Sequence, residues 1–148
     1  MAFLDMDVTE QVAGKHELWE INNTVNISSL AYRFKEIASE VGRHGYGVDV
    51  GLKCLFLQFM YDLSDRRLEK ELRFNLAYRW FCGFTAFEKT PDHSYFGRFR
   101  ERLGTKRIGK LFNAIVKKAK EKHLIREIFQ FVDATSIITK NTTWALVL

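Results

Sequence analysis

The chain has 148 residues, of which 47% are hydrophobic and 28% are charged, with nine Gly and one Pro. This composition is typical of one globular domain with its own core, and it excludes a disordered or linker-like chain. The acidic start does not fit a signal peptide, and the most apolar stretch, Leu52 to Tyr61, is too short to cross a membrane. The two cysteines, Cys54 and Cys82, make no disulfide framework, so we expect a cytoplasmic protein without membrane contact.

The net charge of +5 is unevenly distributed along the chain. The first twenty residues contain five acidic side chains and one lysine, whereas residues 98 to 126 contain eleven basic side chains and two acidic ones. Such a basic segment is typical of proteins that bind a polyanion, with nucleic acid as the first candidate. A solvated basic surface gives the same pattern, so charge alone leaves both interpretations open.

Apolar residues recur at steps of three and four up to about residue 124, which predicts a helical region. The first predicted helix enters through Ser28 or Ser29, and its apolar side comprises Leu30, Phe34, Ile37, Ala38 and Val41. Four glycines between Gly42 and Gly51 predict a loop. Asp49 is then expected to cap a largely buried helix that runs from Leu52 to Leu63.

Ser64 is the expected N-cap of a short helix from Arg66 to Phe74. In this prediction Leu68 and Leu72 face inward, while the opposite face carries Arg66, Lys70 and Arg73 at steps of four and three. Asn75 ends the helix, and a short aromatic helix follows from Leu76 to Phe84.

Two further helices are predicted on either side of Gly104. The first has Thr90 as its expected N-cap and Pro91 as its first residue, with a core side of Phe96, Phe99 and Leu103. Thr105 is expected to cap the second and longest helix, whose buried side comprises Ile108, Leu111, Phe112, Ile115 and Ala119. Its exposed side comprises Lys106, Lys110, Asn113, Lys117 and Lys120. This stripe can follow DNA phosphates, but it is also an ordinary surface for a soluble helix.

After Leu124 the pattern changes to a short, apolar run between Ile128 and Ile138, which predicts a strand buried on both faces. Asp133 lies within this run, directly after Phe131 and Val132. A carboxylate at such a place can hold a divalent cation for phosphoryl chemistry, or it can simply end the strand toward solvent. The histidines and cysteines show no metal-ligand spacing, and no glycine-rich phosphate loop is present.

Four short motifs follow one another in a fixed order. They are Leu63-Ser64-Asp65-Arg66, Arg79-Trp80-Phe81 with Gly83, Pro91-Asp92-His93-Ser94 followed by Arg98-Phe99-Arg100, and Phe131-Val132-Asp133-Ala134-Thr135. Together they resemble the amino-terminal half of bacterial insertion-sequence transposases of the DDE type, in the insertion-sequence-five group, over roughly residues 15 to 144. The resemblance implies that a helical region precedes a ribonuclease-H-like domain. It also implies that Asp133 is the first metal-binding carboxylate.

The same resemblance indicates what this chain lacks. An intact relative carries a second Asp and a Glu that complete its Mg²⁺ or Mn²⁺ site, whereas here no Asp or Glu follows Asp133. One carboxylate cannot build a two-metal site. We therefore expect a truncated transposase that holds no cofactor and is not an enzyme by itself.

These observations predict a mainly α fold in three parts. An acidic segment spans 1–26, a helical DNA-binding or dimerisation domain spans 27–124, and 125–148 forms an orphan strand or hairpin from the truncated start of the catalytic domain. The expected partner is DNA at the terminal inverted repeats of an insertion element. The expected DNA-binding residues are Arg66, Lys70, Arg73, Arg98, Arg100, Arg102, Lys106, Lys110, Lys117 and Lys120.

Two alternatives to DNA binding stay open at this point. The chain can be a helical interaction protein that binds or inhibits intact transposase subunits. It can also be the product of a decayed gene, without a function of its own. Besides DNA, the possible partners are a second copy of this chain and an intact transposase subunit.

Overall fold

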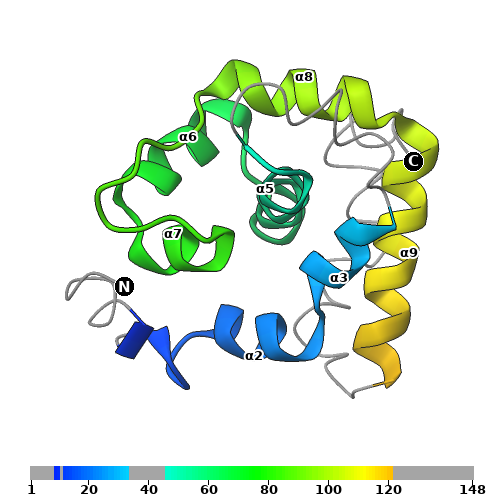
Figure 1. Cartoon of the computed structure of the whole chain (residues 1–148), viewed down its shortest axis with the longest axis horizontal. Coiled ribbons are helices and arrows are strands. Elements are labelled where there is room, and N and C mark those ends of the chain that lie inside the picture. Colours follow the sequence, from blue (N-terminus) through cyan, green and yellow to red (C-terminus); the bar gives the residue numbers. More distant parts are fainter. Residues whose placement is uncertain (1–8, 11, 34–45, 122–148) are drawn as a thin grey trace.

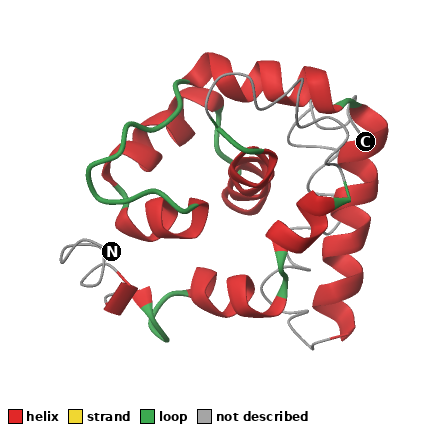
Figure 2. Cartoon of the chain, viewed as in Figure 1, coloured by secondary structure: helices red, strands yellow, loops and turns green. Residues whose placement is uncertain are grey.

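The computed structural model of the chain describes residues 9–10, 12–33 and 46–121 (Figure 1). Helices occupy most of these residues, and no strand occurs among them (Figure 2). In chain order the helices are α2 (Glu17–Thr24), α3 (Ile27–Tyr32), α5 (Val48–Tyr61), α6 (Asp65–Phe74), α7 (Leu76–Cys82), α8 (His93–Leu103) and α9 (Thr105–Glu121). The predicted mainly α fold is confirmed for this part of the chain. The strand predicted between Ile128 and Ile138 lies outside the described residues.

Helix α5 lies at the centre of the fold, and the other helices surround it. Figure 1 shows α5 end-on, with α6 and α7 on one side, α8 above it, and α3 and α9 on the other side. Ten of its fourteen residues are buried, among them Leu52, Leu55 and Leu57. A helix that is apolar on all sides needs such a shell of neighbours. The predicted burial of this helix is confirmed.

Gly51 was expected in a loop, but it lies inside α5. The helix begins at Val48 with Gly47 as its N-cap, so Asp49 lies in the first turn and not at the cap position. Gly51 is buried against the ring of Phe99 on α8, and a Cβ atom at this position would collide with that ring. The glycine therefore allows α8 to approach α5 closely, and it does not serve a turn.

Helix α8 is capped by Asp92 and not by Thr90. The Asp92 carboxylate accepts hydrogen bonds from the backbone N–H groups of Ser94 (3.0 Å) and Tyr95 (3.2 Å). Pro91 consequently lies before the helix, although proline is often the first helical residue. A carboxylate that satisfies two otherwise unpaired N–H groups fixes the start of α8 at His93.

The remaining helix ends follow local signals. Helix α3 is capped by Asn26 and not entered through Ser28 or Ser29, and it ends at Tyr32. The rest of the stretch that was predicted to be helical up to Val41 lies outside the described residues. Helix α2 lies in the acidic segment, for which no helix was predicted. Helix α7 ends at Cys82, earlier than predicted, because Gly83 takes the left-handed conformation with φ at 84°.

Helix α9 completes the shell around α5. Its buried side chains include Ile108, Leu111, Phe112 and Ile115, as predicted, whereas the side chain of Ala119 is not described. Phe112 stacks on Phe59 of α5, with 3.8 Å between ring centroids. Thr105 is the first helical residue of α9, and the preceding Gly104 carbonyl accepts a hydrogen bond from the N–H of Ile108.

Gly51 and Gly109 allow a matched test of this packing. Gly51→Ala should lower the free energy of unfolding by about 1–3 kcal/mol, because the added methyl group overpacks the contact with Phe99. Gly109→Ala in α9 should raise it by up to about 1 kcal/mol, since no atom lies within 4 Å of the added Cβ and alanine favours a helix. Urea unfolding of both variants measures the two effects. Equal effects of the same sign would contradict the close approach of α8.

Candidate nucleic-acid interface

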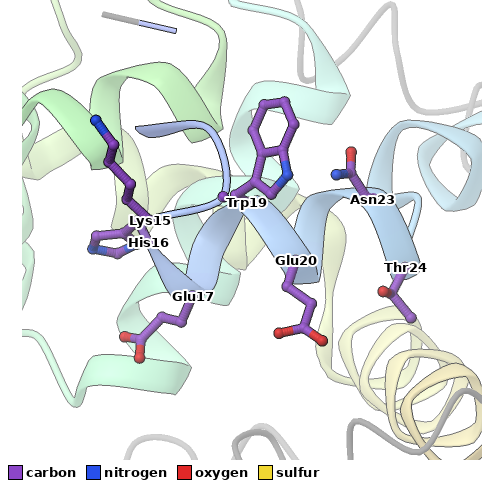
Figure 3. Close-up of a pocket in the computed structure, with 8 residues that line it drawn as sticks. Lys15, His16, Glu17, Trp19, Glu20, Asn23 and Thr24 are labelled. Carbon is purple, nitrogen blue, oxygen red and sulfur yellow. The ribbon is translucent and has the colours of Figure 1, made fainter. Parts of the chain in front are cut away.

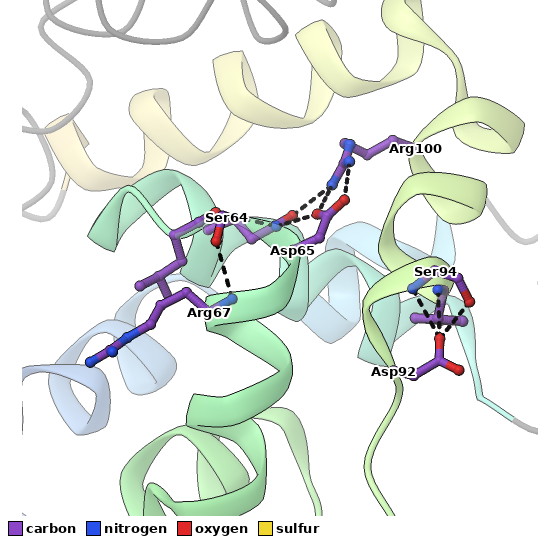
Figure 4. Close-up of polar contacts among 9 residues, drawn as sticks. Ser64, Asp65, Arg67, Asp92, Ser94 and Arg100 are labelled. Atoms are coloured by element: carbon purple, nitrogen blue, oxygen red, sulfur yellow. Dashed lines mark hydrogen bonds and ion pairs between the residues drawn. The ribbon is translucent and has the colours of Figure 1, made fainter.

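Helix α6 has a narrow buried side and a wide polar side. Ser64 caps it as predicted, because its hydroxyl oxygen accepts a hydrogen bond from the N–H of Arg67 at 3.1 Å (Figure 4). Leu68 and Leu72 are fully buried, also as predicted. Arg66, Lys70 and Arg73 are exposed, and their positions place them on the face opposite the two leucines.

The first acidic residue of α6, Asp65, is bound by neighbouring helices. Its carboxylate accepts two hydrogen bonds from the Arg100 guanidinium on α8, Nη1 to Oδ1 at 2.8 Å and Nη2 to Oδ2 at 2.9 Å (Figure 4). The amide of Gln58 on α5 donates to Oδ1 at 2.7 Å and accepts from Arg100 Nη1 at 2.9 Å. Partial burial works to raise the pKa of Asp65, but the hydrogen bonds from Arg100 and Gln58 outweigh it and lower that pKa.

The other two acidic residues of α6 are also paired. The Glu69 carboxylate accepts a hydrogen bond from the backbone N–H of His93 at 3.0 Å and lies 3.3 Å from His93 Nδ1. These contacts lower the pKa of Glu69, and Arg73 adds a smaller electrostatic effect. Glu71 forms a salt bridge with Arg67 at 2.9 Å and accepts a hydrogen bond from the Asn75 amide. All three acidic side chains of α6 thus have partners within the fold.

The exposed basic face of α6 has no acidic partner of this kind. Neither Arg66 nor Lys70 nor Arg73 forms a salt bridge with an acid among the described residues. Positive charge therefore remains available to solvent or to a ligand on this face. We call Arg66, Lys70 and Arg73 the basic face of α6.

The structure separates the predicted residues of α8 and α9 into two groups. Arg100 points inward to Asp65, so both of its terminal nitrogens are bound within the fold. The others lie on exposed positions: Arg98 and Arg102 on α8, and Lys106, Lys110, Lys117 and Lys120 on α9. Asn113 is exposed on the same side of α9. The predicted stripe of α9 is thus at the surface along its length.

Helix α8 connects the basic positions of the three helices. It packs against α6 on one side and against α9 on the other, and it lies between them in Figure 1. Arg102 lies in the last turn of α8 and Lys106 in the first turn of α9, and the chain changes direction between them at Gly104. Exposed basic residues therefore occur on both sides of Gly104, and those of α9 continue along that helix.

Sequence reasoning missed several of these pairs. Arg67 is more than half exposed on α6, and its i, i+4 spacing to Glu71 is a local signal for the salt bridge. The pairing of Asp65 with Arg100 spans 35 residues, so no local pattern indicates it. The pairing of Glu69 with His93 spans 24 residues and is equally hidden.

A pocket of about 440 Å³ lies beside α2 (Figure 3). Trp19 lines it and stacks on Trp80, with 5.3 Å between ring centroids. Its charged lining residues are of both signs, namely Lys15, Glu17 and Glu20. Such a mixed lining does not favour a polyanion, so the pocket is not part of the candidate interface.

Metal ligands and thiols are two kinds of side chain that often carry chemistry, and their positions and burial among the described residues decide what they can do. No group of three His, Cys, Asp or Glu side chains among them could hold a metal ion. Cys54 and Cys82 are free thiols with 3.9 Å between their Sγ atoms, and the hydrogen bond with Cys82 together with burial raises the pKa of Cys54. A buried thiol with a raised pKa is a poor nucleophile. Asp133 lies outside the described residues.

These features define a mainly α domain with exposed basic helix faces, and no helix among its described residues is long and apolar enough to span a bilayer. The family model Transposase domain (DUF772) matches residues 6–102. The chain therefore belongs to this transposase domain family, and the predicted relationship to transposases is confirmed. The match includes α6 and most of α8 but not α9. No curated protein and no solved structure matches the chain significantly.

The ion pair between Asp65 and Arg100 predicts a pH-dependent stability. Arg100→Met should lower the free energy of unfolding by about 2–3 kcal/mol near neutral pH, because it leaves the partly buried Asp65 without its cation. The pKa of Asp65 is lowered in the fold, so the pair stabilises the fold above the ordinary carboxyl pKa, and this contribution is lost as pH falls below about 4. Urea unfolding should therefore show a smaller difference at about pH 3.5.

Arg98→Met is the matched control for this measurement. Arg98 is exposed on the same helix, so its replacement should change the free energy of unfolding by less than about 0.5 kcal/mol. A loss for Arg100→Met that is the same at both pH values would show that the arginine acts through packing alone.

Proposed function

We propose that this chain is the DNA-binding part of a transposase and that it binds the terminal inverted repeats of its insertion element. One observation carries the proposal. On α6 the acidic side chains are paired at the base and flanks, while Arg66, Lys70 and Arg73 remain exposed on one face. A helix face with this charge distribution suits a polyanion, and membership of a transposase domain family makes DNA the polyanion to test first.

The basic residues of α8 and α9 have a different part in this proposal. Arg98, Arg102 and the lysines of α9 are exposed on two consecutive helices, and lysine side chains suit contacts with backbone phosphates. Arg100 has no part in DNA binding in this proposal, because its guanidinium is bound to Asp65 and Gln58. It acts by positioning α6.

A second candidate function is supported by exposed aromatic side chains. Phe74 at the end of α6 is 71% exposed, and Phe87 in the loop after α7 is 77% exposed. The buried Arg79 guanidinium fixes this loop by donating hydrogen bonds to the carbonyls of Thr85 and Glu88. Apolar side chains held at a surface are typical of protein contacts, so binding to an intact transposase subunit is the alternative. Co-purification with such a subunit in the absence of DNA would favour it.

We propose further that the chain is of the DDE type, in the insertion-sequence-five group, on the order of its four motifs. By that resemblance Asp133 is the first metal-binding carboxylate. The described residues contain no cluster that fits a divalent cation, and no Asp or Glu follows Asp133 in the chain. Strand cleavage is therefore not part of the activity proposed for this chain.

Binding to DNA should depend steeply on salt. If about five basic side chains contact phosphates, the logarithm of the affinity should fall with the logarithm of salt concentration at a slope near −4 to −5. Fluorescence anisotropy with a labelled duplex of the inverted repeat measures this slope. A nearly flat dependence would contradict phosphate contacts.

The triple variant Arg66→Ala, Lys70→Ala, Arg73→Ala should weaken binding to the inverted repeat more than any other triple replacement of exposed basic residues. A matched control replaces Lys106, Lys110 and Lys117 of α9 and removes the same charge. Because all six side chains are exposed, both variants should keep the helix content of the parent protein in circular dichroism.

The purified chain should not cleave or join DNA in the presence of Mg²⁺ or Mn²⁺. One carboxylate cannot supply the ligands of a two-metal site, so the Asp133→Ala variant should be indistinguishable from the parent in a strand-cleavage assay. Metal-dependent cleavage that disappears in the Asp133→Ala variant would overturn this expectation.

A further inference from the structure

Helices α5 and α6, with the short turn between them, have the form of a helix-turn-helix unit. The turn consists of Asp62, Leu63 and Ser64, and such units join their helices through three or four residues. Asp62 takes the left-handed conformation, with φ at 53° and ψ at 54°, which glycine often supplies at such turns. In Figure 1 α5 is seen end-on, whereas α6 runs across the view.

The two helices differ in burial as the helices of a DNA-binding unit do. Helix α5 is buried on nearly all sides and forms the scaffold, whereas α6 buries only Leu68 and Leu72. The carboxylate of Asp65 fixes the first turn of α6 to α5 through Gln58 and to α8 through Arg100. A side chain on a helix that is held in this way reaches a ligand with a defined geometry.

We propose that α6 is the recognition helix of this unit, that it enters the major groove of DNA, and that Arg66 and Lys70 contact base edges there. This inference rests on the proposed DNA binding and specifies which helix reads the sequence. Ten helical residues span about 15 Å, and the major groove, about 12 Å wide, admits an α-helix. The amino-terminal residues of a recognition helix contact the bases; Arg66 lies in the first turn of α6, and Lys70 follows one turn later at the middle of the helix.

The charge distribution on α6 fits this arrangement. Arg66, Lys70 and Arg73 would all face the groove, and Arg73 in the last turn would lie near the phosphates at its edge. Glu69, the acid next to this face, is held by the N–H and ring of His93 on α8. The neighbouring carboxylate therefore has partners within the fold and does not extend toward the phosphates.

Helix α9 fits the role of recognition helix less well. It is joined to α8 by the single residue Gly104, which is shorter than the turn of a helix-turn-helix unit. Its exposed basic side chains are lysines spread along the helix, which suits phosphate contacts at many positions. It also lies beyond the residues that match the transposase domain family, whereas α6 lies within them.

The test measures whether α6 reads guanine in the major groove. The full chain first selects its preferred site from a pool of random 20-base-pair duplexes, and each guanine of that site is then replaced by 7-deazaguanine, which lacks the N7 acceptor. The parent protein should lose about tenfold or more in affinity at one or two guanines. Arg66→Ala or Lys70→Ala should bind the unmodified site about tenfold more weakly and show no further loss at one of these guanines.

Arg67→Ala and Lys110→Ala are the matched controls. Each removes one exposed positive charge, the first from α6 and the second from α9, and neither residue belongs to the basic face of α6. Both should keep the loss caused by 7-deazaguanine. The inference is wrong if that loss disappears in the Lys110→Ala variant and persists in full in the Arg66→Ala and Lys70→Ala variants, or if 7-deazaguanine has no effect on the parent. Salt-dependent binding without any preferred site would overturn groove reading and leave the proposed function intact. No binding to any duplex would overturn both.

Discussion

A polar side chain on a buried central helix must find partners inside the protein, and this constraint determines how α5, α6 and α8 fit together. Gln58 on α5 is only 2% exposed. Its amide group donates to the Leu63 carbonyl and to Asp65, and it accepts from Arg100. The start of α6 and the last turn of α8 are therefore fixed relative to α5, because leaving any of these buried polar groups unpaired costs free energy.

The same constraint gives chemically identical side chains different roles. Arg98, Arg100 and Arg102 lie in one basic run, but only Arg100 is within reach of Asp65 and Gln58. The other two remain at the surface. Arg79 on α7 is a further case. It is 5% exposed, and its guanidinium donates hydrogen bonds to a backbone carbonyl of α6 and to one in the loop after α7. Net charge therefore overstates the number of cations that are available to a ligand.

Features encoded by neighbouring residues could be predicted from the sequence, whereas features that depend on distant residues could not. The cap at Ser64, the break at Asn75 and the basic face of α6 were predicted correctly, because each depends on side chains within one or two turns. Gly51 was wrongly predicted to lie in a loop, because a glycine is needed there to make room for the Phe99 ring of another helix. Helix α2 was missed because its cap is His16, whose ring nitrogen accepts the hydrogen bond that Ser or Asp usually accepts.

The hydrophobic core of this domain extends beyond the residues that match the family, because α9 contributes to it. The family match ends at residue 102, yet Phe59 on the central helix is covered by Phe112 of α9. Ile108, Leu111 and Ile115 are buried in the same core. A domain cut at the end of the match would expose to water the apolar surfaces of α3 and α8 that pack on α9, and the ring of Phe59 on α5. A stable form of this domain therefore has to include α9, which begins beyond the matched residues.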